Sequence, residues 1–399
     1  MLESLRIKNF RIFRSLEIER LGRVNLLVGK NNSGKSCLLE ALRVYGERGD
    51  PALLDALVCE RDEDLDALLE LGPGLNVAPP DEDVQQVLRD PVRNLFHGYQ
   101  FPSDLRERIE IGPCTAGPKL SIGLRVVVWN RDEEMPQRKV LSVESMDAIP
   151  DGAGLEVESS FSSEGGQQSA RRVPDVRSRM RRSAYRARAS YRGHAPYRER
   201  RPLLEAEQAF EVRCVPTTQM DDSEVERLWD RIVVRPALRE HVVSALRLID
   251  ERIQEIVMLR SERPSAVPVL LYDDESRLPL KGLGDGAAHL FQIVLATAVD
   301  KGGMVLLDEF ENGIHWSVLP RLWKLVFDLA LDLDLQVFAT THSWDCVRAF
   351  MDTAQTHEAE AMLFRLGRSV RSSRRGEIVV RSYDKQSLEL ATQAGLEVR

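Results

Sequence analysis

The first 46 residues show three hydrophobic patterns in succession. Apolar and polar side chains alternate over Leu5–Phe10, which is typical of a strand with one buried face, and Leu16–Ile18 suits its hairpin partner. Val24–Val28 is mostly apolar and predicts a short buried strand. Apolar residues at helical spacing over Cys37–Tyr45 predict a helix, which Gly46 is placed to end. The expected order is therefore three strands, a loop and a helix.

The central part of the chain mixes strand and helix patterns. Leu120–Trp129 and Leu155–Phe161 predict strands within a region of several short strands. Ser223 and Glu226 have the spacing of a capping box and predict a helix start. The apolar stripe over Ala237–Met258 predicts a second helix.

Strands and helices alternate in the last third of the chain. We expect strands at Val269–Tyr272, Met304–Leu307 and Leu335–Ala339, with helices up to Val299 and from Trp316 to Leu331. Ala361–Leu366 and Glu377–Val380 predict two further strands, and a final helix is expected near Ser387. This alternation favours a parallel sheet of the α/β class.

The loop after Val24–Val28 carries the pattern G-x-x-x-x-G-K-S. Backbone N–H groups of such a loop surround the phosphates of a nucleotide, and the following helix N-terminus favours their charge. We expect Lys35 to reach the β and γ phosphates of ATP and the Ser36 hydroxyl to bind Mg²⁺. The residues expected to bind the nucleotide are Gly29, Asn31, Asn32, Ser33, Gly34, Lys35, Ser36 and Cys37.

Two carboxylates follow the expected strand Met304–Leu307. Asp308 is suited to hold Mg²⁺, and Glu309 is suited to orient or deprotonate the attacking water. His342 follows two threonines at the end of another expected strand, where ligands bind in parallel α/β sheets. We interpret His342 as a catalytic contact to the γ-phosphate. The alternative is that all three are ordinary solvated side chains.

The glycine loop and the carboxylates lie far apart in the sequence, which indicates a large insertion. We divide one nucleotide-binding domain into residues 1–46 and 267–399, with residues 47–266 inserted between them. The insert is expected to contain mixed strands, an arginine-rich segment at 171–201 and a short helical arm at 223–259.

Composition narrows the protein class. A formal net charge of −8 argues against a chain that coats nucleic acid over its whole surface, although it permits a local basic site. Five scattered cysteines without a C-x-x-C pair argue against a disulfide framework or a zinc cluster and favour a reducing cytoplasm. The N-terminus lacks a signal-peptide pattern, and no apolar run reaches the roughly 18 residues that span a bilayer. We therefore expect a cytoplasmic protein without a membrane partner.

The arginine-rich segment is a second candidate site. Residues 171–201 contain twelve arginines, three tyrosines and only two carboxylates. Arginines pair with phosphates and tyrosines stack on bases, so one interpretation is contact with nucleic acid. A protein partner is the second interpretation, and a solvated basic loop is the third.

The run Asp308–His315, Asp-Glu-Phe-Glu-Asn-Gly-Ile-His, is the most specific string in the sequence. Together with the glycine loop and His342 it resembles the ATP-binding-cassette (ABC) type of ATPase head, in the RecF-like and OLD-like branch of AAA family ATPases. The resemblance covers residues 1–45 and 267–345. It implies an α/β fold, an ABC-type P-loop NTPase head, with a large inserted α+β or helical region.

The resemblance also implies a homodimer or higher homo-oligomer in which two heads enclose two ATP molecules. A glycine turn of one head would cap the γ-phosphate held by the other, and the contacts expected from this turn are Gly284, Asp285 and Gly286. Gly284 stands where the commoner Leu-Ser-Gly-Gly-Gln form has serine, which is compatible with slow or partner-dependent hydrolysis. Gln100 is a weak candidate for the glutamine loop of the family.

The favoured hypothesis concerns a separate effector. OLD proteins carry a C-terminal TOPRIM nuclease, and the 57 residues after His342 are too few for one. Asp332-Leu333-Asp334 imitates its Asp-x-Asp pair, but we interpret it as a helix end. A head alone resembles the ATPase subunits of two-gene bacterial anti-phage systems such as PARIS or Septu, which implies a separate nuclease or toxin.

Two other functions are suggested by parts of the sequence. A RecF-like DNA-binding ATPase that acts in DNA repair is the alternative, and the basic segment motivates it. A nucleotide-binding subunit of a transporter is disfavoured, because the glycine turn and the Glu-Asn-Gly-Ile-His string both depart from that pattern.

Overall fold

The computed structural model describes residues 1–59, 91–130, 137–150, 153–162, 168–172, 211–260, 265–298, 301–371 and 375–387. It separates into two compact units. The first unit comprises Met1–Glu3, Ile18–Leu39 and Phe210–Arg399, and the second comprises Ser4–Glu17 and Glu40–Ala209.

The main sheet of the first unit contains six strands within the described residues, in the order β16-β15-β3-β14-β13-β9. Their bounds are Ile378–Tyr383 (β16), Ala361–Arg368 (β15), Val24–Val28 (β3), Gln336–Thr341 (β14), Met304–Leu307 (β13) and Val212–Val215 (β9). The five strands from β15 to β9 are parallel, and β16 is antiparallel to β15. The carboxyl ends of β3, β14 and β13 therefore lie at one edge of the sheet, which positions the loops that follow them.

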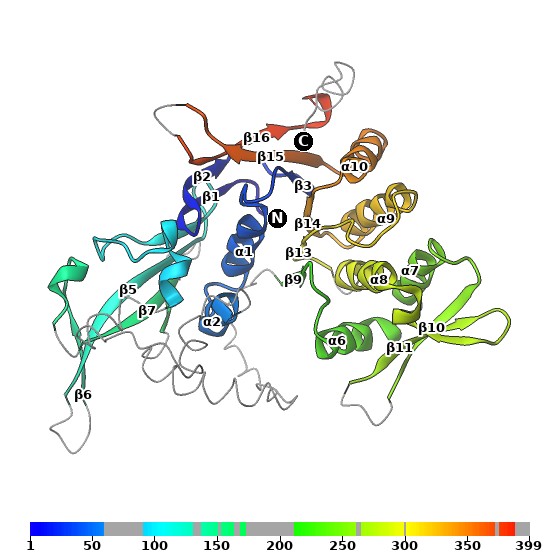
Figure 1. The fold of residues 1–399 in the computed structure, drawn as a ribbon, viewed down its shortest axis with the longest axis horizontal. Coiled ribbons are helices and arrows are strands. Elements are labelled where there is room, and N and C mark those ends of the chain that lie inside the picture. The colour runs from blue at the N-terminus through cyan, green and yellow to red at the C-terminus, as the bar shows by residue number, and fades with distance from the viewer. Residues whose placement is uncertain are drawn as a thin grey trace, which may run out of the picture. The chain divides into compact units, whose positions relative to one another are not determined.

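Three helices lie along one side of this sheet (Figure 1). They are α8 (Asp285–Ala298), α9 (Leu319–Asp332) and α10 (Trp344–Thr356). An aromatic cluster anchors them: the rings of Phe310 and Trp323 stack with centroids 3.9 Å apart, and Phe350 meets Trp323 edge-on at 5.1 Å. Because Phe310 follows the two carboxylates directly, this stack fixes the segment after β13 against α9.

The first unit also contains two helices, a small sheet and a short helix. These elements are α6 (Asp222–Val233), α7 (Pro236–Arg247), β10 (Ile253–Leu259), β11 (Val267–Tyr272), β12 (Arg277–Pro279) and the short helix η4 (Leu280–Leu283). Of these, α6, α7 and β10 precede the expected boundary at residue 267. Strands β10, β11 and β12 form an antiparallel sheet, and Trp229 of α6 packs against Phe291 of α8. The unit resumes at Phe210 rather than at the sequence-based boundary of 267, because β9 pairs with β13.

The helix expected from Ser223 is confirmed as α6, but its expected capping box and the length of the next helix were wrong. The helix expected over Ala237–Met258 ends at Arg247, and Ile253–Leu259 is a strand paired with β11. The helix start near Ser223 is capped by Asp221, whose carboxylate accepts the Ser223 N–H at 2.8 Å. An acidic cap two residues earlier accepts an N–H of the first turn in place of the serine–glutamate box.

The second unit is built on an antiparallel sheet in the order β2-β1-β4-β5-β7-β8, with β6 paired to β5, within the described residues. The strands are β1 (Leu5–Phe10), β2 (Phe13–Ile18), β4 (Ile109–Gly112), β5 (Lys119–Asn130), β6 (Gln137–Leu141), β7 (Gly154–Ser162) and β8 (Gln168–Arg172). The strand predictions for Leu5–Phe10, Leu120–Trp129 and Leu155–Phe161 are thus confirmed. Short helices α2 (Pro51–Cys59), η1 (Pro91–Leu95), η2 (His97–Tyr99) and η3 (Met146–Ala148) complete the described part of this unit.

The α/β fold class expected for the nucleotide-binding part is confirmed by the parallel sheet. Strand β3 runs into the glycine loop, and α1 (Lys35–Gly46) begins at its lysine. This is the strand–loop–helix context that a phosphate-binding loop requires.

Candidate functional site

The glycine loop is held in a conformation that side chains would obstruct. Gly29 has a φ of +149°, and a Cβ there would lie 2.4 Å from the carbonyl oxygen of Leu366. Gly34, with a φ of +98°, precedes α1 directly. Asn31 and Asn32 are exposed, whereas Ser33 and Cys37 are buried. Glycine at the two strained positions therefore lets the loop wrap closely around a ligand.

Lys35 points back into the loop. Its Nζ donates to the carbonyl oxygens of Gly29 at 2.8 Å and Lys30 at 3.3 Å, and the residue is only 5 % exposed. Burial lowers the pKa of Lys35, and the nearby carboxylates, Asp308 first among them, oppose that shift. The lysine thus lies between the loop and the carboxylate segment.

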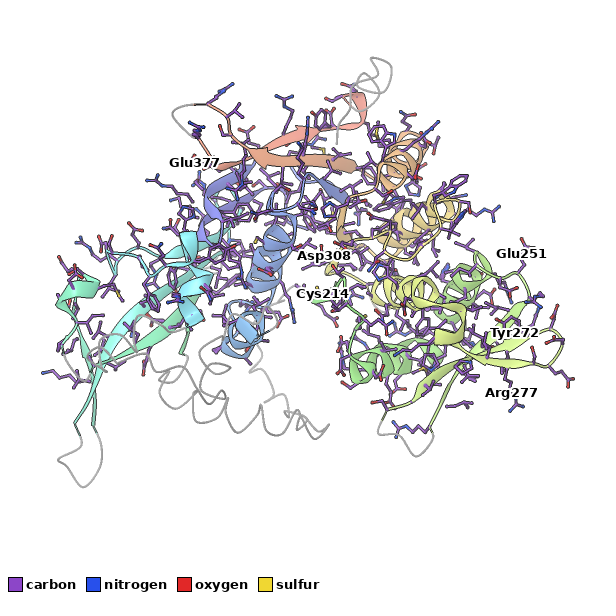
Figure 2. All side chains as sticks on the ribbon, in the orientation of Figure 1. Cys214, Glu251, Tyr272, Arg277, Asp308 and Glu377 are labelled. Carbon is purple, nitrogen blue, oxygen red and sulfur yellow. The ribbon has the colours of Figure 1, made fainter. Side chains whose placement is uncertain are left out.

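Asp308 lies at the end of β13 (Figure 2) and accepts hydrogen bonds from three hydroxyls. Its Oδ1 accepts from Thr340 at 2.6 Å and from Ser36 at 3.4 Å, and its Oδ2 accepts from Thr217 at 3.2 Å. These hydroxyls come from the ends of β14, the start of α1 and the loop after β9. The four oxygen-bearing side chains form a donor set of the kind that Mg²⁺ prefers.

Glu309 adopts a backbone conformation that is unusual for a residue with a side chain. Its φ is +50°, and its N–H donates to the Thr340 hydroxyl at 2.8 Å. The carboxylate is 39 % exposed, and its Oε1 lies 4.0 Å from Nε2 of His342. Glu309 and His342, predicted separately from the sequence, therefore face each other at the sheet edge and remain accessible to a substrate.

Glu311 holds the turn that carries His342. Its Oε1 accepts the backbone N–H groups of His342 and Ser343, both at 2.9 Å. The sequence showed Glu311 only as one letter of the Asp308–His315 string, because its partners lie 31 and 32 residues away along the chain. Through these hydrogen bonds Glu311 links the segment after β13 to the turn after β14.

The glycine turn lies at the start of α8. Gly284 has a φ of +95° and open space around its Cβ position, and Asp285 accepts a hydrogen bond from Gln219 at 3.1 Å. A Cβ on Gly286 would lie 1.8 Å from the carbonyl oxygen of Gly313. The turn is therefore packed against the Gly313–Ile314 backbone of its own chain, in the segment that follows Glu309.

The loop after β9 is the part of the site that sequence reasoning missed. Thr217 donates to Asp308, Gln219 donates to Asp285, and the Thr217 carbonyl accepts from Asn312 at 3.2 Å. The loop thereby joins Asp308 to the glycine turn. A pattern search could have found it only by recognising Val212–Val215 as a strand, and that strand is too short to carry a clear period.

Several predicted residues belong to other elements or to the second unit, or fall outside the described residues. Gln100 follows η2 in the second unit. Arg171 and Arg172 belong to β8, and the remainder of the 171–201 segment lies outside the described residues. The predicted helix end at Asp332 is confirmed, because α9 ends there and Asp334 pairs with Arg23 at 2.8 Å. The helix predicted near Ser387 falls mostly beyond the described residues.

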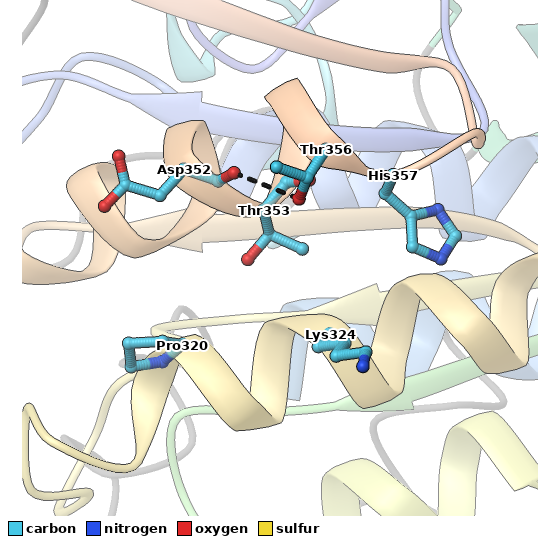
Figure 3. A pocket seen from close by; sticks show the side chains of 6 residues that line it. All are labelled: Pro320, Lys324, Asp352, Thr353, Thr356 and His357. Atoms are coloured by element: carbon cyan, nitrogen blue, oxygen red, sulfur yellow. Dashed lines mark hydrogen bonds between the residues drawn. The ribbon is translucent and has the colours of Figure 1, made fainter.

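A separate pocket of about 440 Å³ lies between α9 and α10 (Figure 3). It is lined by Pro320, Lys324, Asp352, Thr353, Thr356 and His357. Both nitrogens of His357 are engaged: Nε2 lies 3.0 Å from Asp328, and Nδ1 accepts the Ala359 N–H at 3.0 Å. The proton therefore resides on Nε2, and the imidazole serves to join α9 to the end of α10.

Comparison with known proteins supports the nucleotide chemistry. Residues 1–64 match the model of a family described as an AAA ATPase domain. Residues 161–345 match one described as an AAA domain, putative AbiEii toxin, Type IV TA system. The two matches contain the glycine loop and the carboxylates respectively, so the expected ATPase activity is confirmed at the level of the domain family.

Individual relatives are more distant. The chain is 25 % identical over 363 residues to a protein of Helicobacter pylori named ATP/GTP phosphatase, which covers 87 % of this chain and 86 % of that protein. It is 51 % identical over 45 residues to an uncharacterized protein of Methanocaldococcus jannaschii, covering 11 % and 20 % of the two chains. Among solved structures, an SMC head bound to the C-winged helix domain of ScpA aligns with a TM-score of 0.46 and 13 % identity, over 98 % of this chain and 99 % of that one.

None of the helices in the described residues combines the length and the apolar character needed to cross a bilayer.

Proposed function

We propose that this chain is a Mg²⁺-dependent ATP switch that pairs through its ATPase heads and controls a separate effector protein, a nuclease or a toxin, in bacterial defence against phage. One observation carries the ATP-dependent part. Ser36 of the glycine loop lies within hydrogen-bond distance of Asp308 at the end of β13. Two motifs that are 272 residues apart in the sequence therefore form one site.

The residues present fit a magnesium ion. Ser36 and Asp308 would hold it, and the hydroxyls of Thr217 and Thr340 orient the Asp308 carboxylate through both of its oxygens. When bound, Mg²⁺ supplies charge stabilisation to the phosphates during transfer. Lys35 would exchange neutral carbonyl acceptors for charged phosphate oxygens, which form stronger hydrogen bonds with an ammonium group.

Glu309 and His342 would perform the hydrolytic step. Glu309 is positioned to take a proton from, or to orient, a water molecule that attacks the γ-phosphate. His342 lies 4.0 Å from Glu309 and would contact the same phosphate. Attack by water breaks the bond between the γ-phosphorus and the bridging oxygen, releasing ADP and inorganic phosphate.

The start of α8 supports pairing of two heads. Gly284 and Asp285 are exposed, and a Cβ on Gly284 would meet nothing within 4 Å. A helix N-terminus with glycine beside it favours an approaching phosphate through its N–H groups and dipole. A second head would present that phosphate to the turn.

We also propose that the loop after β9, rather than Gln100, acts as the glutamine loop of this head. Thr217 reaches Asp308 and Gln219 reaches the glycine turn. A movement of this loop would therefore change the hydrogen bonds of both Asp308 and the glycine turn, which would face the second head.

The proposal of a separate effector is supported by family descriptions. The match over residues 161–345 carries the description of a putative toxin from a type IV toxin–antitoxin system, and such systems pair two proteins. This supports a role in a two-component system, while the assignment to phage defence rests on the analogy with ATPase heads that work with a separate effector in two-gene anti-phage systems.

The ATPase assignment is tested with two site variants and two matched surface controls. Lys35→Ala should abolish ATP binding, measured with a fluorescent ATP analogue, because a buried cation that faces the loop is lost. Glu309→Gln should bind ATP normally and hydrolyse it at least about a hundredfold more slowly. Lys301→Ala and Glu358→Gln, both exposed, should behave as the wild type. Normal hydrolysis by Glu309→Gln would show that the catalytic role is wrong.

The effector assignment is tested in the native host. A tagged chain should co-purify with the product of a neighbouring gene, and the gene pair should reduce plaque formation while the same pair with Lys35→Ala should not. Recovery of the chain alone, with no nuclease or toxin encoded beside it, would contradict the proposal.

A second candidate function is a RecF-like ATPase that binds DNA itself, which the twelve arginines of 171–201 favour. Here the discriminating variant changes Arg179, Arg181, Arg182, Arg186 and Arg188 to alanine. A DNA-binding ATPase should show salt-dependent binding of double-stranded DNA that this variant loses, whereas equal binding by both proteins would exclude that role for the segment.

A further inference from the structure

The two strands at one end of the main sheet carry a local concentration of positive charge. Strands β15 and β16 form an antiparallel pair at the end of the sheet opposite to β9 (Figure 1). Over residues 361–383, here called the edge hairpin, the sequence contains six arginines and one glutamate and no other charged side chain. The chain as a whole has a formal net charge of −8, so the edge hairpin is a basic region on an acidic protein.

The arginines of the edge hairpin are exposed and lack carboxylate partners. Arg365 and Arg381 are directly opposite each other in the register of the two strands, and both are exposed. Side chains in such positions have Cβ atoms about 5 Å apart, and like charges there repel each other. Neither residue forms an ion pair with any described residue, and the same is true of three further exposed arginines, Arg368, Arg371 and Arg375.

The nearest carboxylates in the sequence do not neutralise this charge. Glu360, directly before β15, pairs with Arg20 at 2.5 Å. Asp384, directly after β16, accepts the Ser387 N–H at 2.8 Å. Glu377 is the one carboxylate inside the edge hairpin, and a single negative charge cannot balance six arginines. The hairpin therefore has an excess of positive charge that is open to an external anion.

Protection of a sheet edge accounts for only part of this pattern. Charged side chains on an edge strand prevent it from pairing with other chains, which is sufficient reason for Arg381 on β16. The same reason does not apply to Arg365, because β15 is paired with β3 on one side and with β16 on the other. A bound anion over both arginines would remove their mutual repulsion.

The charges lie on both faces of a two-stranded ribbon. Pairing of β15 with β3 ends at Arg365, opposite Val28, whereas pairing with β16 continues to Arg368, opposite Ile378. Because side chains alternate along a strand, Arg365 and Arg381 lie on one face of the hairpin and Arg368 lies on the other. A flat acidic surface on a protein would meet one face only. The major groove of B-form DNA is bordered by two phosphate backbones and admits a two-stranded ribbon, so it can meet both faces.

We propose that the edge hairpin is a surface that binds double-stranded DNA, with its arginines in contact with the phosphate backbone. A guanidinium group forms two parallel hydrogen bonds with a phosphate. Contacts of this kind position a duplex and carry no sequence information. The proposal depends neither on the catalytic role of Glu309 nor on the arginines of 171–201.

The phosphates of ATP are a second source of the same chemistry, because the hairpin adjoins the glycine loop. The carbonyl oxygen of Leu366 lies so close to Gly29 that a Cβ there would be 2.4 Å away. The experiment therefore has to separate DNA from the nucleotide. Affinity for a fluorescent ATP analogue is measured beside affinity for DNA.

The test compares two double variants of the full-length protein that lose the same charge. Arg365→Gln with Arg381→Gln removes the opposed pair. Arg277→Gln with Arg348→Gln is the control, because these arginines of β12 and α10 are also exposed and form no ion pair with a described residue. Fluorescence anisotropy measures binding of a short labelled DNA duplex, without nucleotide and over a range of salt concentrations. Unlabelled duplex and poly-glutamate are used as competitors.

We expect wild-type binding to weaken as salt increases, because each phosphate contact releases counterions. In the Arg365→Gln, Arg381→Gln variant the slope of log K against log salt should fall by about two, one for each arginine lost, and affinity should fall at least about tenfold at low salt. The control variant should keep the wild-type slope. Affinity for the ATP analogue should stay within about twofold in both variants, and poly-glutamate should compete far less well than the unlabelled duplex.

Four results would overturn the proposal. They are no DNA binding by the wild type, equal slopes in the hairpin and control variants, displacement of DNA by poly-glutamate as effective as by duplex, and a loss of ATP affinity with unchanged DNA binding. If the first double variant does not fold, Arg371→Gln with Arg375→Gln gives the same comparison, since both residues lie outside β15 and β16. The assay contains no nucleotide, so a failure of the proposed ATPase function would leave its outcome unaffected.

Discussion

At the scale of single residues, the hydroxyl of Thr340 connects the two carboxylates of the site. It donates to Asp308 at 2.6 Å and accepts the N–H of Glu309 at 2.8 Å, and the residue is fully buried. One oxygen atom therefore orients Asp308, which we propose holds Mg²⁺, and accepts the backbone N–H of Glu309, which we propose is catalytic. Removing it should disturb both functions together.

We expect Thr340→Val to lower stability by about 1–3 kcal/mol, because valine keeps the shape but leaves a buried N–H without an acceptor. The Mg²⁺ concentration for half-maximal hydrolysis should rise roughly tenfold, equivalent to about 1.4 kcal/mol. Urea denaturation and a Mg²⁺ titration of ATPase activity measure the two effects. Thr297→Val, which loses a hydroxyl bonded only within α8, should leave the Mg²⁺ titration unchanged; equal shifts in both variants would contradict the role given to Thr340.

Cys346 gives a prediction that depends on pH. The residue is fully buried, and burial raises the pKa of its thiol to about 12. Roughly one thiol in ten thousand is then ionised at pH 8, so alkylation by iodoacetamide should be far slower than at the partly exposed Cys214. Because the pKa in the folded state is raised, this thiol favours the folded state fully below its ordinary pKa near 9 and loses that contribution between pH 9 and 12. Peptide mass spectrometry after timed alkylation measures the ratio, and equal rates would contradict a closed core around Trp323.

The site residues that the sequence revealed are those whose chemistry is specific to a motif. Lys35, Ser36 and Asp308 could be predicted because a phosphate-binding loop and a carboxylate strand restrict residue type and order. Thr217 and Gln219 could not, since a threonine or a glutamine suits many positions and their contacts form only when separate elements are brought together. For such residues the deciding information is which strand or helix lies next to which.

At the scale of elements, the contact between α8 and the segment after β13 depends on Gly286. Alanine in a helix interior is favoured over glycine by about 1 kcal/mol, and Gly286 has no positive φ to oppose the change. The obstacle is steric: the new Cβ would lie 1.8 Å from the backbone oxygen of Gly313, which cannot move aside as a flexible side chain would. The clash should outweigh the gain in helix propensity.

We therefore expect Gly286→Ala to destabilise the protein by about 1–3 kcal/mol and to lower the rate of ATP hydrolysis. Gly367→Ala is the matched control, because a Cβ at that position meets nothing within 4 Å and its φ is not positive. Thermal denaturation and ATPase assays of the two variants give the comparison. If the Gly286→Ala protein is as stable and active as the Gly367→Ala protein, the close contact between the backbones of Gly286 and Gly313 is not required.

Elements with a long and regular pattern could be predicted, and short or mixed ones could not. Strands β3, β13 and β14 and helices α8 and α9 lie where apolar runs and helical spacing placed them. The stripe over Ala237–Met258 was read as one helix because Ile253 and Ile256 fit both a helical and a strand period. The structure ends α7 at Arg247, whose side chain bonds to the carbonyl of Ile253 at 2.8 Å, and pairs the following residues with β11. Pairing with β11 therefore determines that Ile253–Leu259 is a strand, because its local spacing is compatible with both a strand and a helix.

At the scale of the whole molecule, the chain builds its first unit from three separated stretches. The sequence indicated an inserted region, but it placed the return to the nucleotide-binding domain at residue 267, where the first clear strand pattern begins. The structure returns at Phe210, since β9 completes the edge of the main sheet and the loop after it contacts Asp308. A four-residue edge strand has too few positions for its pattern to show which sheet it joins.

The structure contains one chain, so pairing of two heads has to be tested in solution. We expect the Glu309→Gln variant to form a stable pair. If the glycine turn of one head caps a γ-phosphate held by another, the pair is stable only while that phosphate remains bound to ATP. Blocking hydrolysis should therefore convert a transient complex into a lasting one. The molar mass of Glu309→Gln, measured by light scattering after size exclusion, should double with Mg²⁺ and ATP and should not change with ADP. Adding Lys35→Ala to the same chain removes the phosphate contact and should restore the mass of the single chain. A molar mass that does not change with nucleotide, or that doubles equally with ADP, would contradict pairing through the γ-phosphate. Each head would then hydrolyse ATP without a second head.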